Sequence, residues 1–150
     1  FVKNKKNINI DQIMKLTNLA ENYNVSELID SYLAANFKKT INILNENNFS
    51  IEDCILITRT LLIKSKRLYK LLLEINDNKS IEEAISSFKP PIFWKDKETV
   101  KQQIKNWSLN TAENLIYKTN ELELLIKKNS NNSINILSDF IINQPNRISN

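Results

Sequence analysis

The sequence contains no glycine and no histidine, and its only cysteine is Cys54. Glycine-rich phosphate loops and dinucleotide fingerprints need residues that let the backbone approach a phosphate, so neither motif is expected. Without histidine the chain has no imidazole base and no histidine metal ligand. A single cysteine makes neither an intrachain disulfide nor a zinc site, and its apolar surroundings predict an inert core residue. We therefore expect no catalytic residue, no metal and no cofactor.

Long apolar runs are also missing, so no segment is expected to cross a bilayer and no membrane partner is expected. The first residues, Phe-Val-Lys-Asn-Lys-Lys, are not followed by the apolar stretch of a signal peptide. These features make the cytoplasm the expected location. A chain that opens with Phe1 rather than methionine is expected to be a fragment.

What the sequence does contain is helical periodicity. Apolar residues recur at helical spacing throughout, and no segment alternates like a strand. At 150 residues the chain fits one hydrophobic core, and its net charge of +4 permits an acidic partner without demanding one. The sequence predicts an all-α fold, a helical bundle around one long central helix.

Capping pairs predict where the helices begin. Asn9 with Gln12 predicts a short first helix, and Asn24 with Glu27 predicts the start of a second. The side chains expected on the inner face of the first helix are Ile10, Ile13, Leu16 and Leu19. Later helices are expected over about 37–45, 51–75, 81–88, 95–106, 108–128 and 133–142.

The helix over about 51–75 is the longest and is expected to be buried on much of its perimeter. Its apolar stripe is predicted to run through Ile51, Ile55, Leu62, Tyr69 and Leu72, widened by Ile57, Leu61, Leu68 and Leu71. Since glycine is missing, asparagine is expected to end the helices and form the turns. The asparagines expected there are Asn22, Asn47, Asn48, Asn76, Asn78 and Asn129.

Two groups of residues are candidates for a partner interface. One is a basic patch on the long helix, which either contacts a neighbouring subunit or is simply exposed; it consists of Arg59, Lys66, Arg67 and Lys70. The other is the bulky apolar group Pro91–Trp94, in the helix break that Pro90 and Pro91 impose, with Phe93 and Trp94 as its candidate contact residues. This group either closes the core at one end of the bundle or anchors a partner.

A third candidate is a stripe of lysines. Lys97, Lys101 and Lys105 recur every four residues and share one helix face, which suits phosphate contacts and equally suits a solvated surface. The acidic groups Glu82–Glu83 and Glu121/Glu123 are the remaining catalytic candidates. Nothing in the sequence places two of these carboxylates in one cleft.

The order of the helical segments resembles the delta subunit of bacterial DNA polymerase III. The early part of the match consists of Val25–Asn36, Ile41–Leu44 and Ile55–Leu61, the last with Arg59 on a long helix. The later part consists of Pro90–Lys95, Gln103–Ser108 and Thr119–Lys127. The resemblance covers about Asn9 to Ile142, and no single motif in it is specific. It departs from the family at Ala35–Asn36 and Asn47–Asn48, where glycines are usual.

The resemblance implies a domain division and a role. Residues 1–22 would end a preceding lid domain, 23–144 would form the helical collar domain, and 145–150 would be a C-terminal tail. The collar holds the subunits of the clamp loader together while the complex loads the sliding clamp onto primed DNA. Partners would be the other loader subunits, with the clamp contacted through an absent N-terminal domain and DNA through the complex. The fragment would have no catalytic site, although it would belong to a nucleotidyltransferase holoenzyme.

The alternative from another class is a stand-alone nucleic-acid-binding helical domain that uses the lysine stripe. A small helical enzyme is a third hypothesis.

Overall fold

The computed structural model of the chain describes residues 9–143, apart from the side chains of Met14 and residues 16–21. Within this range the fold is all-helical and no strand occurs, as predicted. The α-helices are α2 (Ile10–Leu33), α3 (Phe37–Glu46), α4 (Ile51–Asn76), α5 (Ile81–Ser87), α6 (Lys97–Asn106), α7 (Leu109–Lys128) and α8 (Ser133–Ile142). Two 3₁₀ turns, η1 (Trp94–Asp96) and η2 (Ser130–Asn132), precede α6 and α8. No helix in this range is long and apolar enough to span a membrane.

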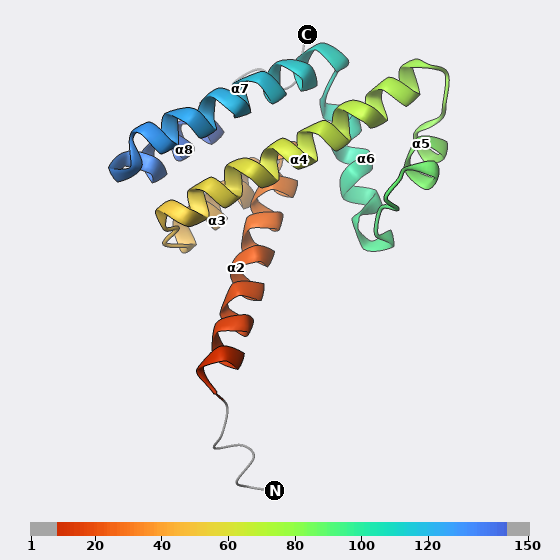
Figure 1. The fold of residues 1–150 in the computed structure, drawn as a ribbon. Coiled ribbons are helices and arrows are strands. Elements are labelled where there is room, and N and C mark those ends of the chain that lie inside the picture. The colour runs from red at the N-terminus through yellow and green to blue at the C-terminus, as the bar shows by residue number, and fades with distance from the viewer. Residues whose placement is uncertain (1–8, 144–150) are drawn as a thin grey trace, which may run out of the picture.

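Helix α4 is the centre of the bundle. It lies alongside α7, which returns in the opposite direction, and it also contacts α2, α5, α6 and α8 (Figure 1). Its start is fixed by a capping box, in which Ser50 Oγ accepts from the amide of Asp53 and the Asp53 carboxylate accepts from the amide of Ser50. The same device starts α5 at Ser80 and α7 at Ser108, so these predicted helix starts are confirmed.

The first two predicted helices are one continuous helix. Asn9 caps α2 as expected, but α2 runs on through Asn22 and Asn24 to Leu33. Asn24 does not cap a new helix, because its side-chain amide donates to Asn47 Oδ1 at 3.0 Å. Asparagine in a helix costs less than about 1 kcal/mol relative to alanine, which is too little to stop a helix whose next turns are buried. The prediction that Asn22 ends a helix is therefore wrong.

The start of α2 projects away from the other helices (Figure 1). Ile10 is 75% exposed and Ile13 is 52% exposed. The prediction that these two side chains point into a core is therefore wrong. The side chains of Leu16 and Leu19 lie outside the described ones. Among the described side chains of α2, Val25 is the first buried one, and the predicted division at 22/23 falls inside the helix. The predicted tail, 145–150, lies outside the described residues.

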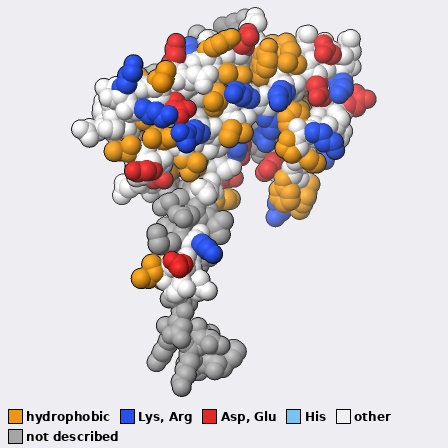
Figure 2. Space-filling view, in the orientation of Figure 1, with side chains coloured by type: hydrophobic (Ala, Val, Ile, Leu, Met, Phe, Trp, Pro, Cys, Tyr) orange, Lys and Arg blue, Asp and Glu red, His pale blue; other side chains and the backbone are white. Residues whose placement is uncertain are grey.

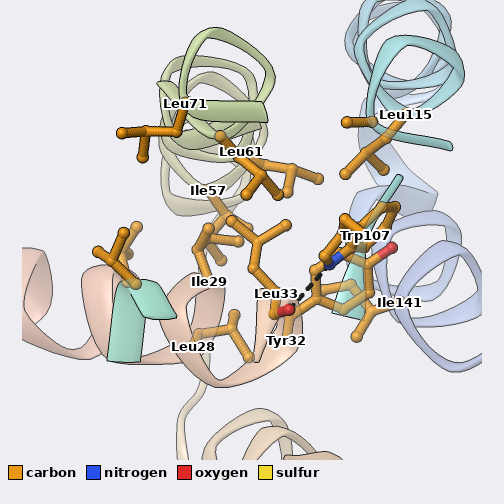
Figure 3. Packing of buried hydrophobic residues seen from close by; sticks show 14 of the residues in the cluster. Leu28, Ile29, Tyr32, Leu33, Ile57, Leu61, Leu71, Trp107, Leu115 and Ile141 are labelled. Atoms are coloured by element: carbon orange, nitrogen blue, oxygen red, sulfur yellow. Dashed lines mark hydrogen bonds between the residues drawn. The ribbon is translucent and has the colours of Figure 1, made fainter. Parts of the chain in front are cut away.

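The core gathers around the middle of α4 (Figure 3). Ile57, Leu61 and Leu71 of α4 are fully buried, and the same cluster contains side chains from α2, α7 and α8. The buried arc is therefore centred on the residues that were expected only to widen the stripe. Ile51, expected in the stripe, is 41% exposed at the first turn of the helix.

The indole of Trp107 joins α2 to the start of α7. Its Nε1–H donates to the carbonyl oxygen of Leu33 at 2.8 Å, and its ring packs beside Tyr32 with centroids 6.5 Å apart (Figure 3). Trp107 is 7% exposed and is therefore a core aromatic.

Asparagine occupies some of the helix C-terminal positions at which glycine is usual. Asn78 adopts the left-handed conformation, with φ 73°, directly after α4, and Asn47 and Asn129 occupy C-cap positions. The end of α2, however, uses an alanine. Ala35 has φ 58°, the amide of Ala35 donates to Tyr32 O, and the amide of Asn36 donates to Ser31 O. This is the Schellman arrangement, in which glycine is preferred because it has no Cβ.

Ala35→Gly is therefore expected to stabilise the protein. Removing the Cβ relieves a conformation that costs roughly 1 kcal/mol for an L-residue, partly offset by the greater freedom of glycine in the unfolded chain. We expect a gain of about 0.5–1 kcal/mol in the free energy of unfolding, measured by urea titration. Ala34→Gly is the matched control, because Ala34 has φ −78° and gains nothing from glycine. Equal effects of the two substitutions would contradict the assignment.

Candidate protein-binding surface

The connection between α5 and α6 displays two aromatic side chains. Phe88 at the end of α5 is 7% exposed and Ile92 is 8% exposed, so the connection is held at both points against the core. Between them Lys89–Pro90 is a cis peptide bond. Directly after Ile92, Phe93 is 57% exposed and Trp94 is 68% exposed. Ile92 therefore closes the core at this point. The alternative that Phe93 and Trp94 close the core is wrong, because both are exposed.

The outer face of α4 lies next to this connection. Ile63 is 68% exposed because it points away from Leu61 and Leu68, which lie in the core. Lys66 and Lys70 follow at helical spacing on the same outward side.

A groove separates the outer face of α4 from the connection. It has a volume of about 520 Å³. Its α4 wall consists of Ile63, Lys66, Arg67 and Lys70, and its other wall consists of residues 88–93 with Asp96. We call it the basic–aromatic groove. The structure thus brings together two candidate groups that lie more than twenty residues apart in the sequence. Figure 2 shows hydrophobic side chains beside lysine and arginine side chains on the part of the molecule that carries α5 and α6.

Trp94 lies next to Phe93 but is not one of the residues that line the groove. Its ring lies 5.9 Å from that of Phe93 at an interplanar angle of 51°. The ammonium group of Lys95 lies 5.4 Å from the centroid of Trp94, a cation–π distance. The Phe93–Trp94 pair is therefore held by local contacts, and both residues remain more than half exposed.

The charge of the groove is unbalanced. Lys66, Arg67, Lys70 and Lys89 line it, and none of them makes an ion pair with any residue in the described range. Asp96 is the single acidic residue among the described lining residues. The groove therefore carries a net positive charge, and exposed apolar side chains lie beside that charge.

Arg59, the remaining member of the predicted basic patch, is separate from this groove. Its Nε lies 3.2 Å from Glu123 Oε1 on α7, and Lys127 Nζ lies 2.8 Å from the same oxygen. The hydrogen bond from Lys127, followed by that from Arg59, lowers the pKa of the Glu123 carboxyl. Arg59 therefore links α4 to α7 within the bundle.

The lysine stripe lies on α6 and is partly neutralised. Lys101 Nζ is 3.4 Å from a carboxylate oxygen of Glu98 and 3.4 Å from one of Glu82 on α5. Hydrogen bonds and charge from Glu98, and then from Glu82, raise the pKa of Lys101. Lys105 is exposed and Lys97 is half-buried. The stripe is therefore neutralised at its centre, at Lys101, rather than forming a purely basic face.

Two of the acidic candidates, Glu82 and Glu83, serve local structure. The backbone amide of Ser80 and then its hydroxyl lower the pKa of Glu83, which completes the capping box of α5. For Glu82 the largest cause of a lowered pKa is its own backbone amide, followed by Lys101. Glu121 borders a different hollow, of about 370 Å³, between α7 and α8.

A polar network that sequence reasoning missed joins α2, α4 and α6. Lys64 Nζ lies 2.7 Å from Asp30 Oδ2 and 2.6 Å from Ser26 Oγ. Gln103, which is 1% exposed, donates to the backbone and side-chain oxygens of Asp30 at 3.2 and 3.3 Å. The spacing along the sequence could have indicated this network. Lys64 lies seven residues from both Ile57 and Leu71, so it shares their buried side of the helix, where a lysine needs a partner.

Cys54 is fully buried on α4, as predicted. Burial, and secondarily the charge of Asp53, raises the pKa of its thiol from 9.0 to about 11. Between these two values the unfolded chain loses the thiol proton while the native chain keeps it, so stability falls as pH rises.

We expect wild type to lose about 1 kcal/mol more stability than Cys54→Ala between pH 8 and pH 10. Urea titrations of the two proteins are compared at each pH. The contribution of lysines and tyrosines to the pH dependence of stability is the same in both proteins and therefore cancels. A parallel decline in the two proteins would contradict the assignment.

No protein-family model matches the chain, and neither a curated protein nor a solved structure matches it.

Proposed function

We propose that this chain is an assembly module, the helical collar domain of a clamp-loader delta subunit, which helps to hold together the complex that loads the sliding clamp onto primed DNA. The observation that carries the proposal is the basic–aromatic groove, where unpaired cations lie beside exposed apolar side chains. Interface cores are enriched in aromatic residues and arginine, and exposed aromatics on a rigid support are typical binding anchors. The ordered resemblance to the delta subunit supplies the identity of the assembly.

Two further features support a binding role over a chemical one. Of the acidic candidates, Glu83 completes a helix cap, Glu82 pairs with Lys101, and Glu123 pairs with Arg59 and Lys127. The aromatic surface rests on two buried anchors, Phe88 and Ile92, so it is presented by a fixed part of the fold. A preformed surface loses little conformational entropy on binding.

The proposal is tested by mixing the chain with the other clamp-loader subunits of the same cell and measuring the mass of the product by light scattering. A complex that includes the chain is expected. The paired change Ile63→Asp with Phe93→Asp is expected to reduce its formation at least roughly tenfold, because it places charge at the centre of the apolar surface. The matched control is Ile10→Asp with Ile13→Asp, which alters two exposed apolar residues on α2 instead. Failure of the unaltered chain to join the complex would refute the proposal.

The nucleic-acid-binding alternative keeps one observation in its favour, the three lysines on one face of α6. Primed and single-stranded DNA are titrated against the chain at 50 and 200 mM salt. Tight binding that Lys97→Gln, Lys101→Gln and Lys105→Gln together abolish would favour this alternative. We expect weak binding instead, since Glu82 and Glu98 neutralise Lys101 at the centre of the stripe.

A further inference from the structure

We propose that the basic–aromatic groove binds an extended peptide segment of a partner protein in which acidic residues alternate with bulky apolar ones. This inference rests on the proposed assembly function and names the chemistry of the partner. It follows from the different character of the two walls of the groove.

The α4 wall is basic at a regular spacing. Lys66 and Lys70 are four residues apart on one helix, so their attachment points are separated by about 6 Å along the helix axis. Arg67 lies beside them on the same wall. In an extended peptide, side chains on one face recur every second residue, at about 6.6 Å. Carboxylates at alternate positions of an extended segment therefore match the spacing of the cations.

The opposite wall is apolar. Pro90, Pro91, Ile92 and Phe93 supply apolar lining, and Lys89 and Asp96 are the charged residues of this wall. The intervening side chains of an extended peptide point away from α4 and toward this wall. Bulky apolar residues at those positions bury their surface against the prolines and Phe93. The volume of about 520 Å³ lies within the range of ligand clefts, roughly 300–1,000 Å³, and accommodates a few side chains.

The charges select an acidic occupant. Four cations of the groove are without an ion-pair partner among the described residues, against one carboxylate, Asp96. Opposite charge across an interface accelerates association and rejects partners of the same sign.

The aromatic pair disfavours a single-stranded nucleic acid, the other polyanion that such charges attract. Base stacking needs an open, flat aromatic face. The ammonium group of Lys95 lies over the ring of Trp94, and Phe93 is tilted at 51° against it. The two inclined rings form an apolar surface that is not flat. Such a surface suits aliphatic and aromatic side chains better than a stack of bases.

The test uses the unaltered chain and a synthetic ten-residue peptide in which aspartate alternates with leucine or phenylalanine. Binding is followed by the fluorescence of Trp94, which is 68% exposed, and independently by calorimetry. Saturable binding is expected, weakening as salt rises from 50 to 300 mM. A peptide of the same composition with its aspartates in one block is expected to bind at least fivefold more weakly. So is a peptide with asparagine in place of aspartate.

The groove variant is Arg67→Glu with Lys70→Glu, which is expected to weaken binding roughly tenfold or more. The matched control is Lys38→Glu with Lys118→Glu, two exposed lysines on α3 and α7 that change the net charge by the same amount. Phe93→Ser is expected to weaken binding of the alternating peptide while leaving the thermal midpoint unchanged, since Phe93 is exposed. Trp94→Phe is expected to keep the calorimetric binding and to lose the fluorescence signal.

Three results would overturn the inference. They are equal affinity for the alternating and block peptides, equal loss in the groove and control variants, and tighter binding of a ten-nucleotide oligothymidylate that the groove variant abolishes. The two proposals fail separately. If the peptide does not bind but the chain still joins the clamp-loader subunits, the peptide inference alone is wrong. If the peptide binds as described but the chain joins no such complex, the assembly proposal alone is wrong.

Discussion

Leu61→Ala is expected to destabilise the protein by about 3 kcal/mol. Leu61 is fully buried at the middle of α4, where the central helix meets side chains from its neighbours (Figure 3). Truncation removes apolar contacts and leaves a cavity in a closely packed interior, and such changes cost about 2–5 kcal/mol. The loss is measured by urea titration followed by helical circular dichroism, with the dependence on urea unchanged.

Ile63→Ala is the matched control for that prediction. Ile63 lies two residues further along α4 but is 68% exposed, so its truncation is expected to change stability by less than about 0.5 kcal/mol. The two substitutions remove side chains of equal size from the same helix, and therefore separate burial from helix propensity. Comparable losses at the two positions would contradict the placement of the core on one side of α4.

Trp107→Ala is expected to cost about 3–5 kcal/mol, and Trp107→Phe about 2 kcal/mol. The alanine variant loses a large buried ring, its contact with Tyr32 and its hydrogen bond to Leu33. The phenylalanine variant retains most of the packing but removes the donor for the Leu33 carbonyl. That carbonyl lies in the last turn of α2, where backbone oxygens lack partners within the helix.

Denaturant titration and tryptophan emission test the second prediction together. Trp94→Ala is the control and is expected to change stability by less than about 0.5 kcal/mol, because Trp94 is mostly exposed. In wild type the emission contains a buried and an exposed component. Loss of the red-shifted component in Trp94→Ala, with retention of the blue-shifted one, is expected. An equal cost for Trp107→Phe and Trp94→Ala would show that the indole hydrogen bond contributes nothing.

The parts of the fold that sequence reasoning predicted correctly depend on local signals. Ser50, Ser80 and Ser108 each lie three residues before a polar partner, so the helix starts follow from contacts within one turn. The continuity of α2 was not predicted, because the side chain of Asn24 can form hydrogen bonds either within its own turn or with a distant residue. In isolation its side chain suits a cap, whereas the fold offers it Asn47, twenty-three residues away.

Some members of the candidate surface could be predicted from the sequence, but their arrangement could not. Arg67 and Lys70 were candidates for a partner interface on the long helix, and Phe93 and Trp94 were candidates beside a proline break. Their meeting depends on the path of the α5–α6 connection, which is set by the burial of Phe88 and Ile92. The sequence also gave no reason to assign Arg59 to a different surface, because its partner, Glu123, belongs to a helix sixty-four residues away.

The uninterrupted course of α2 has a mechanical consequence. Its segment from Ile10 to Asn24 spans about 22 Å as a single rod, and its last turns are fixed by buried side chains and by the indole of Trp107. A rod held at one end acts as a lever. A tilt of about 10° at the buried end displaces the Ile10 end by about 4 Å, and in the reverse direction a push on the Ile10 end delivers torque to the residues that surround α4.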